Sequence, residues 1–181
     1  MNLKRSIKNC LRGNILILLV LCVASALRLI YVLRLKDTPV GDKLLIDSAY
    51  YHQAALRLIL DGWVGDQVFF MNPFYSYFLA VIYTNLGTSW LWVWIIQSGL
   101  GTMVCYFTYL LGARLWNEKV GLIAAAFLAL YGVLIFYDGA LLTASPIMFL
   151  NTWALVLLLG PNRLHWTSLT GAGILLGLSA T

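Results

Sequence analysis

Two aspartates, Asp47 and Asp138, have the residue type and the setting that chemistry at a membrane would need. The sequence contains only seven acidic residues in 181. Six of them are aspartates beside hydrophobic stretches: Asp37, Asp42, Asp47, Asp61, Asp66 and Asp138. A carboxylate near a membrane surface costs free energy unless it is solvated or paired, and it commonly marks a functional site. The segments around Asp47 and Asp138 are therefore the first candidates.

Asp47 opens a stretch with helical periodicity. The pattern predicts a helix over residues 47–61 that stops at Gly62. Its apolar face consists of Tyr51, Ala55 and Leu58, whereas Ser48, His52 and Gln53 fall on other faces. A helix this polar does not span a bilayer, so we expect it to lie on the membrane surface.

Two interpretations of Asp47 follow from this placement. As the residue before a helix, it accepts backbone N–H bonds and acts as an N-cap. As an exposed carboxylate at the membrane edge, it is a general base that accepts a proton from an acceptor hydroxyl while a sugar leaves its phosphate. Residue type alone favours the cap, since an aspartate before a helix most often has only that role.

The composition identifies the surroundings of these acids. Hydrophobic residues make up 61% of the chain and charged residues only 10%, against about a quarter charged in soluble domains. The chain is therefore expected to be an integral membrane protein, long enough for about five spans of roughly 20 residues. The net charge of +5 is explained by membrane topology, and no nucleic-acid partner is expected.

The basic N-terminus, residues 1–13, precedes a first span at 14–35. Its cations are Lys4, Arg5, Lys8 and Arg12. Positive charge before a first span places the N-terminus in the cytoplasm. A cleavable signal peptide is the alternative. The apolar run continues to Leu35 without a small-residue cleavage site, which favours a retained anchor.

The rest of the chain divides into a long external loop and four more apolar runs. The loop covers 36–89, and the runs cover 90–111, 120–137, 146–160 and 167–181. The last run ends before it is long enough to cross, so the sequence looks truncated. Three tryptophans at the start of the second span suggest an aromatic belt at headgroup depth: Trp90, Trp92 and Trp94. Within that span we expect Gln97 to bond between helices, beside packing through Gly99 and Gly101. Ser145 before a proline is expected to cap the helix at 146–160.

The segment 73–86 decides the topology, because it is apolar but only about 21 Å long as a helix. The sidedness of three loop cations depends on it: Arg114, Lys119 and Arg163. If 73–86 crossed the membrane, these cations would lie outside, against the positive-inside tendency. If it lies along the interface, they are cytoplasmic, and Asp47 and Asp138 share the external face. We favour the interfacial helix, whose aromatic residues suit headgroup depth.

Motifs in a fixed order along the chain carry a resemblance to a known family. They are ALRLIY at 26–31, DSAYY at 47–51, GW at 62–63, FFMNPFYSYFL at 69–79, Gln97, GARL at 112–115 and FYDGALL at 136–142. Together they resemble the N-terminal part of the bacterial protein-mannosyltransferase-like glycosyltransferases. Those are enzymes of the GT-C fold and include the protein O-mannosyltransferases and the aminoarabinose transferases of lipid A. The resemblance extends over nearly all of the chain and depends on order and spacing.

The resemblance implies an all-α polytopic enzyme of GT-C type, with about four complete spans, a truncated fifth and two interfacial helices at 47–61 and 73–86. It implies transfer of a sugar from a polyprenyl-phosphate donor to a lipid, glycan or protein acceptor. The site would face outward from the bacterial inner membrane. The family's catalytic aspartate maps onto Asp47, and Asp138 is expected to support it. Family members are several hundred residues long, so this portion alone is expected to be inactive.

The chain departs from the family pattern at two positions. Ser48 stands where members often carry a second acid, and Ser145 stands where some carry an acid before a proline. Asp138 lies seven residues before Ser145, as in a subset with the pattern Tyr-Asp-Gly-x-Leu-Leu. A divalent metal would need more ligands than two separated aspartates and His52 provide, so no cofactor is assigned.

Three more residues are candidates for substrate binding, each with a simpler alternative. Arg28 either extends to the headgroups or contacts the donor phosphate. Arg57 meets either lipid phosphates or the donor, and Asn72 is either a helix cap or a substrate contact. A non-catalytic membrane subunit or a lipid-linked transporter is the alternative function. Transporters place polar groups near the middle of the membrane, whereas these spans are nearly free of charge.

Overall fold

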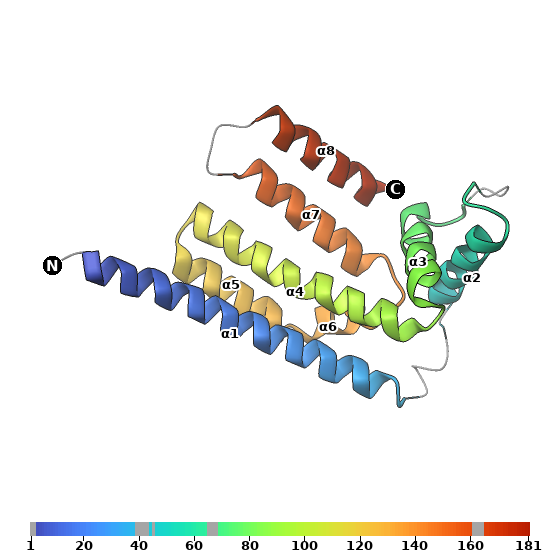
Figure 1. Ribbon diagram of the computed structural model, residues 1–181, viewed down its shortest axis with the longest axis horizontal. Coiled ribbons are helices and arrows are strands. Elements are labelled where there is room, and N and C mark those ends of the chain that lie inside the picture. The colour runs from blue at the N-terminus through green and yellow to red at the C-terminus, as the bar shows by residue number, and fades with distance from the viewer. Residues whose placement is uncertain (1–2, 39–43, 45, 65–68, 161–164) are drawn as a thin grey trace.

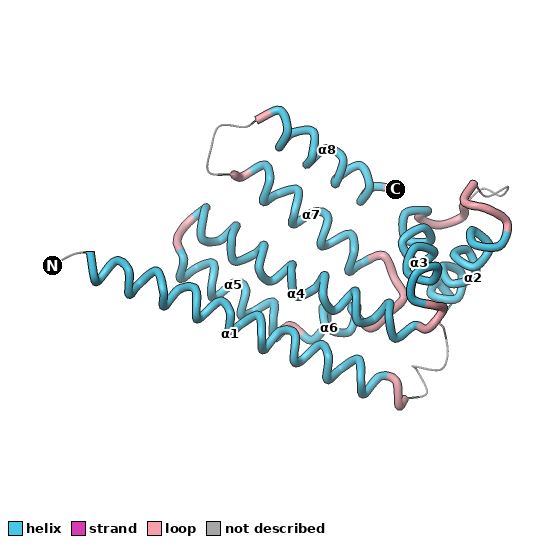
Figure 2. The backbone as a smooth tube through the Cα atoms, viewed as in Figure 1, coloured by secondary structure: helices cyan, strands magenta, loops and turns pink. Residues whose placement is uncertain are grey.

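The computed structural model describes residues 3–38, 44, 46–64, 69–160 and 165–181, with side chains from residue 15 onward. This part of the chain is helical, and no strand occurs among the residues described (Figure 2). The helices are α1 (Leu3–Leu35), α2 (Ile46–Leu60), α3 (Pro73–Leu86), α4 (Trp90–Leu115), α5 (Glu118–Leu130), α6 (Gly132–Asp138), α7 (Ala144–Leu158) and α8 (Trp166–Ala180). An all-α architecture, as predicted, is confirmed.

Helix α4 is the centre of the bundle. It packs against α1, α5 and α7, and α8 packs on the outer side of α7 (Figure 1). The approach of α4 to α5 depends on glycine, because a Cβ on Gly112 would lie 2.6 Å from the Cα of Gly121. Small residues let apolar helices approach closely enough to gain dispersion energy where no hydrophobic effect drives them together.

Within the part of the chain that the structure describes, two helices are long and apolar enough to cross a membrane, Ile15–Leu35 within α1 and Trp90–Leu115. The bent pair α5 and α6 makes a third if it counts as one span, whereas α7 and α8 are apolar but have only 15 residues each. These helices and the composition fit a membrane protein. The larger number of spans expected from the sequence stays a prediction.

The two ends of the bundle differ in what they carry. Helix α1 begins, α4 ends and α5 begins at one end, and the short helices α2 and α3 lie at the other (Figure 1). Helix α3 has the bounds predicted for it, with Pro73 in its first turn and Gly87 beyond its end in a left-handed conformation, φ 86°. It packs chiefly on α2 across the end of the bundle (Figure 1). The basic N-terminal side chains and Arg163 lie outside the described residues.

Helix α2 begins at Ile46, so Asp47 lies in its first turn and the prediction of Asp47 as N-cap is wrong. Boundaries shift by a residue or two because helix ends are weakly defined. The stop at Gly62 is confirmed, since that residue has φ 99°. The buried face includes Tyr51, Ala55 and Leu58, as predicted, but also Ser48, which the sequence placed on another face.

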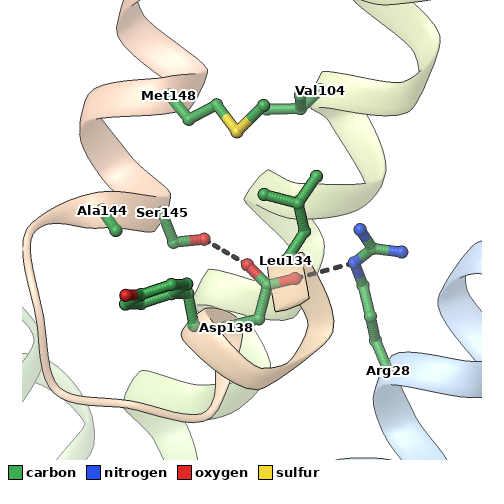
Figure 3. A pocket seen from close by; sticks show the side chains of 9 residues that line it. Arg28, Val104, Leu134, Asp138, Ala144, Ser145 and Met148 are labelled. Carbon is green, nitrogen blue, oxygen red and sulfur yellow. Dashed lines mark hydrogen bonds and ion pairs between the residues drawn. The ribbon is translucent and has the colours of Figure 1, made fainter. Parts of the chain in front are cut away.

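The helix expected over 120–137 is broken. Tyr131 is extended, with φ −75° and ψ 100°, and α5 and α6 meet there at 59°. Gly132 follows the break, and glycine favours helix less than other residues except proline. The bend places Asp138 at the end of α6 against α1 and α4 (Figure 3).

Candidate functional site

Arg28 and Asp138 form a buried ion pair between α1 and α6. The side chains are only 1% and 4% exposed, and Arg28 Nε donates to Asp138 Oδ2 at 2.8 Å (Figure 3). Arg28 also donates to the carbonyl of Ala24 at 3.3 Å. The arginine lies about 10 Å before the end of α1. Its interpretation as a side chain extended to the headgroups is therefore wrong, because an internal carboxylate pairs with it.

Gly101 makes the space for this pair. A Cβ built on Gly101 would lie 2.8 Å from Arg28 Nε and closer still to the Asp138 carboxylate. Gly99, on the same helix, has nothing within 4 Å of such a Cβ. Packing through Gly101 is thus confirmed, whereas packing through Gly99 is not.

Ser145 provides a second hydrogen bond to the Asp138 carboxylate. Its hydroxyl donates to Asp138 Oδ1, opposite the bond from Arg28 (Figure 3). Helix α7 begins at Ala144, so Ser145 lies inside the first turn and makes no side-chain cap. The serine that stands in place of an expected acid is therefore a partner of Asp138, which the sequence did not reveal.

Gln97 is the predicted interhelical hydrogen-bonding residue, and this is confirmed. It is fully buried, accepts from Tyr75 Oη at 2.6 Å and donates to the carbonyls of Asp138 and Ala140 at 3.0 and 2.8 Å. One amide therefore joins α3 to the turn that follows α6. Because buried polar groups are costly unless paired, this arrangement fixes the turn relative to both helices.

A small cavity lies against the ion pair. Its volume is about 40 Å³, and the polar side chains that line it are Arg28, Tyr137, Asp138 and Ser145. The remaining walls include Val104, Leu134 and Met148 (Figure 3). This volume exceeds the roughly 10–15 Å³ that one water requires. It accommodates water or a similarly small group beside the pair.

Asp47 has the opposite setting. It is exposed in the first turn of α2. Within the described residues no bond joins Asp47 to Asp138, whose carboxylate bonds to Arg28 and Ser145. The two acids therefore do not form a carboxylate pair.

The segments that carry the two acids nevertheless meet. Ser48 and residues 139–141 line a common cavity of about 50 Å³. Leu141 also packs in the same hydrophobic core as Tyr51, one turn after Asp47. The segments that follow the two acids are therefore neighbours at the end of the bundle that carries α2 and α3.

Burial shifts the pKa of two side chains on α2, Tyr51 and His52. Burial raises the pKa of Tyr51, and the nearby Asp47 carboxylate adds to that effect. Burial lowers the pKa of His52, whose Nδ1 lies 2.9 Å from Tyr83 Oη. His52 is thus hydrogen-bonded, and its neutral form is favoured.

The other candidate binding residues lie apart from the ion pair. Asn72 occupies the N-cap position of α3 without a side-chain cap bond, and its Oδ1 is buried with no hydrogen-bond partner in the described structure. Arg57 is exposed in the last turn of α2, about 15 Å along the helix axis from Asp47. Among the residues described, no group of three or more histidine, cysteine or acidic side chains comes together.

Comparisons with protein-family models, with curated proteins and with solved structures give no match. The family resemblance therefore depends on the sequence motifs alone.

Proposed function

We propose that this chain is part of a membrane glycosyltransferase of GT-C type. It would transfer a sugar from a polyprenyl-phosphate donor to a lipid, glycan or protein acceptor, with Asp47 as the general base. The observation that carries the proposal is the convergence of the two acid-bearing motifs, because Ser48 and residues 139–141 line one cavity at the end of the bundle.

The setting of Asp47 suits proton transfer from an acceptor. The residue is exposed and in reach of a substrate that arrives at the membrane surface. Its helix α2 and the neighbouring α3 lie across the end of the bundle (Figure 1), as interfacial helices would. A carboxylate that an incoming substrate can reach is able to accept a proton as the acceptor oxygen attacks.

The Arg28–Asp138 pair has a supporting role in this proposal. Its charges neutralise each other in the interior, so Asp138 does not compete with Asp47 as a base. Instead, Asp138 and Gln97 hold the turn at residues 139–141 in place beside Ser48. Asp138 thus positions the wall of the site, and Arg28 holds the Asp138 side chain in place.

The direct test replaces Asp47 by asparagine in the full-length protein. Sugar transfer from the lipid-linked donor should fall by at least about 100-fold, the usual contribution of a general base. Asp61→Asn, an exposed aspartate just beyond the other end of α2, is the matched control and should retain transfer. Near-normal transfer by Asp47→Asn at equal expression would remove Asp47 from the catalytic role.

The topology has a separate test. A single cysteine in place of the exposed Glu118, in a cysteine-free background, reports the side of the α4–α5 turn. The proposal requires this turn to be cytoplasmic, so a membrane-impermeant thiol reagent should label it only after the membrane is opened. Labelling of intact cells would place the turn outside and contradict an external site at Asp47.

One observation favours the alternative function. An ion pair buried within the bundle is a feature of transporters, where charged groups mark a substrate or proton path. A transporter or non-catalytic subunit would tolerate Asp47→Asn but lose its function on Asp138→Asn. The two variants therefore discriminate between the functions, provided that both proteins reach the membrane in equal amounts.

A further inference from the structure

We propose that Tyr51 is a positioning residue for the proposed reaction, because it fixes the helix of Asp47 to the turn that follows Asp138. This inference rests on the proposed function, which makes Asp47 the general base. It adds a residue that acts through Asp47 and does not itself hold the sugar.

Tyr51 anchors the N-terminal half of α2. It lies four residues after Asp47, so the two residues are neighbours on successive turns of the helix. Asp47 is exposed, whereas Tyr51 is only 6% exposed. A contact that fixes the Tyr51 side chain therefore also fixes the turn that carries Asp47.

The ring of Tyr51 is connected to α4 and α6 through α3. It packs edge-on against the ring of Tyr75, with the ring centroids 4.9 Å apart, and aromatic pairs of this kind stabilise beyond their buried area. The Tyr75 hydroxyl donates to Gln97. Gln97 in turn donates to the carbonyls of Asp138 and Ala140. These contacts join Tyr51 to the backbone at the end of α6.

The turn after Asp138 also contacts Tyr51 directly. Leu141 packs in the same hydrophobic core as Tyr51. Thr143 occupies the N-cap position of α7, where a threonine side chain usually caps the helix, but its side chain makes no cap bond. Instead it hydrogen-bonds the Tyr51 hydroxyl, and this bond lowers the pKa of Tyr51 against the increase caused by burial and by the Asp47 charge.

These contacts matter because a general base must lie within hydrogen-bond reach of the proton that it accepts. Helix α2 packs chiefly on α3, so its place relative to the bundle is set by side chains that reach beyond α3. Tyr51 contacts both α3 and the turn that follows Asp138. It therefore sets where Asp47 lies relative to the second acid-bearing motif.

The first experiment tests the anchor without a substrate. Hydrogen exchange of the α2 amides is followed by mass spectrometry on the full-length protein in lipid nanodiscs. Tyr51→Phe and Thr143→Val should each speed exchange about fivefold, the effect of losing one hydrogen bond between uncharged groups. The double variant should be no faster than either single variant, because both remove the same bond.

Two further variants are the controls for exchange. Thr143→Ser keeps the hydroxyl and should keep the slow exchange of α2. Tyr106→Phe removes a hydroxyl from a partly exposed tyrosine of α4 and should leave α2 unchanged. Should Tyr51→Phe fail to reach the membrane, the comparison of Thr143→Val with Thr143→Ser carries the test by itself.

The second experiment tests the positioning role in membranes that contain the full-length protein and their own acceptors. The donors are undecaprenyl-phosphate-linked mannose, glucose and aminoarabinose, tested in parallel. In Tyr51→Phe the kcat should fall about tenfold, within the roughly 100-fold that misplacement of a catalytic group by about 1 Å can cost. The KM for the donor should stay unchanged. In Asp47→Asn, the added Tyr51→Phe should cause no further loss, because Tyr51 acts through the carboxylate of Asp47.

The outcomes separate this inference from the proposed function. Unchanged exchange of α2 in Tyr51→Phe or in Thr143→Val overturns the anchor, including when none of the three donors is transferred. Normal kcat in Tyr51→Phe together with lost transfer in Asp47→Asn overturns the positioning role and leaves the proposed base in place. A further loss in the double variant assigns Tyr51 a structural role alone and overturns the inference as well. Normal transfer in Asp47→Asn removes the base itself, and hydrogen exchange then decides the anchor separately.

Discussion

The Arg28–Asp138 pair and Asp47 are two charged regions of an apolar chain, and their surroundings differ. Asp138 lies in the interior, where an arginine, a serine and a glycine accommodate its carboxylate. Asp47 lies exposed on a short helix at the end of the bundle. The difference teaches that the two acids have separate tasks. A fully bonded buried charge fixes structure, whereas an exposed carboxylate can exchange a proton.

The largest contrast should come from removing each acid. Asp138→Ala leaves Arg28 charged and unpaired in the interior, which costs about 3–5 kcal/mol. Asp47→Ala should change the free energy of unfolding by less than about 0.5 kcal/mol, as expected for an exposed site. Thermal unfolding in detergent measures both. Replacing Arg28 by Met together with Asp138 by Leu should restore most of the loss, because it removes both charges. Equal losses at positions 47 and 138 would contradict the comparison.

A methyl group next to the pair tests how tightly it is packed. Gly101→Ala places a carbon against Arg28 Nε and the Asp138 carboxylate, and the overpacking should cost about 1–3 kcal/mol. Gly99→Ala, two residues away with nothing within 4 Å, should be neutral or slightly stabilising since alanine favours helix. The midpoint of thermal unfolding distinguishes them. A neutral Gly101→Ala would mean that the pair can move.

Removal of one hydroxyl tests the connection between the two regions. Tyr75→Phe deletes the donor to Gln97 Oε1 and leaves that oxygen buried, at a cost of about 1–2 kcal/mol. Tyr106→Phe on α4, a tyrosine that is 38% exposed, should have an effect below about 0.5 kcal/mol. If the bond to Gln97 holds α3 in place, protease should also cleave between α2 and α3 faster in Tyr75→Phe. The Tyr106→Phe control should show no such increase.

The smallest effect should come from the pH response of α2. Burial lowers the pKa of His52 in the folded protein, whereas unfolding returns it to about 6.5. The unfolded state therefore binds more protons below that pH, and stability should fall as the pH drops through 6.5 toward the folded pKa. Unfolding measured from pH 7.5 to 5 should show this slope. His52→Gln should flatten it, and a slope that persists in this variant would assign it to another group.

Much of the local structure could be predicted from residue types and spacing. The proline at 73 and the glycine at 87 define α3, and the positive φ of Gly62 follows the end of α2. The apolar face of α2 at Tyr51 follows from periodicity. These features depend on a few neighbouring residues, so the sequence carries them directly.

The site depended on contacts between distant segments. Arg28 and Asp138 are 110 residues apart, and nothing in their local patterns pairs them. The bend at Tyr131, which directs Asp138 inward, was hidden in a continuous apolar run. The burial of Ser48 and the bond from Ser145 to the Asp138 carboxylate were missed, because small residues are common on helix faces. The only available indication was the occurrence of these serines near the acids.

By itself the sequence determined that this is an apolar, helical chain with few acids, and that two acid-bearing motifs deserve attention. Only the tertiary structure decided which acid is neutralised inside and which remains exposed. The physical reason is that helix propensity and periodicity act over a few residues, whereas the state of a carboxylate depends on the burial and partners that packing provides. Asp138 meets Arg28 because α1, α4 and α6 close around Gly101, and Asp47 stays exposed because α2 lies at the end of the bundle.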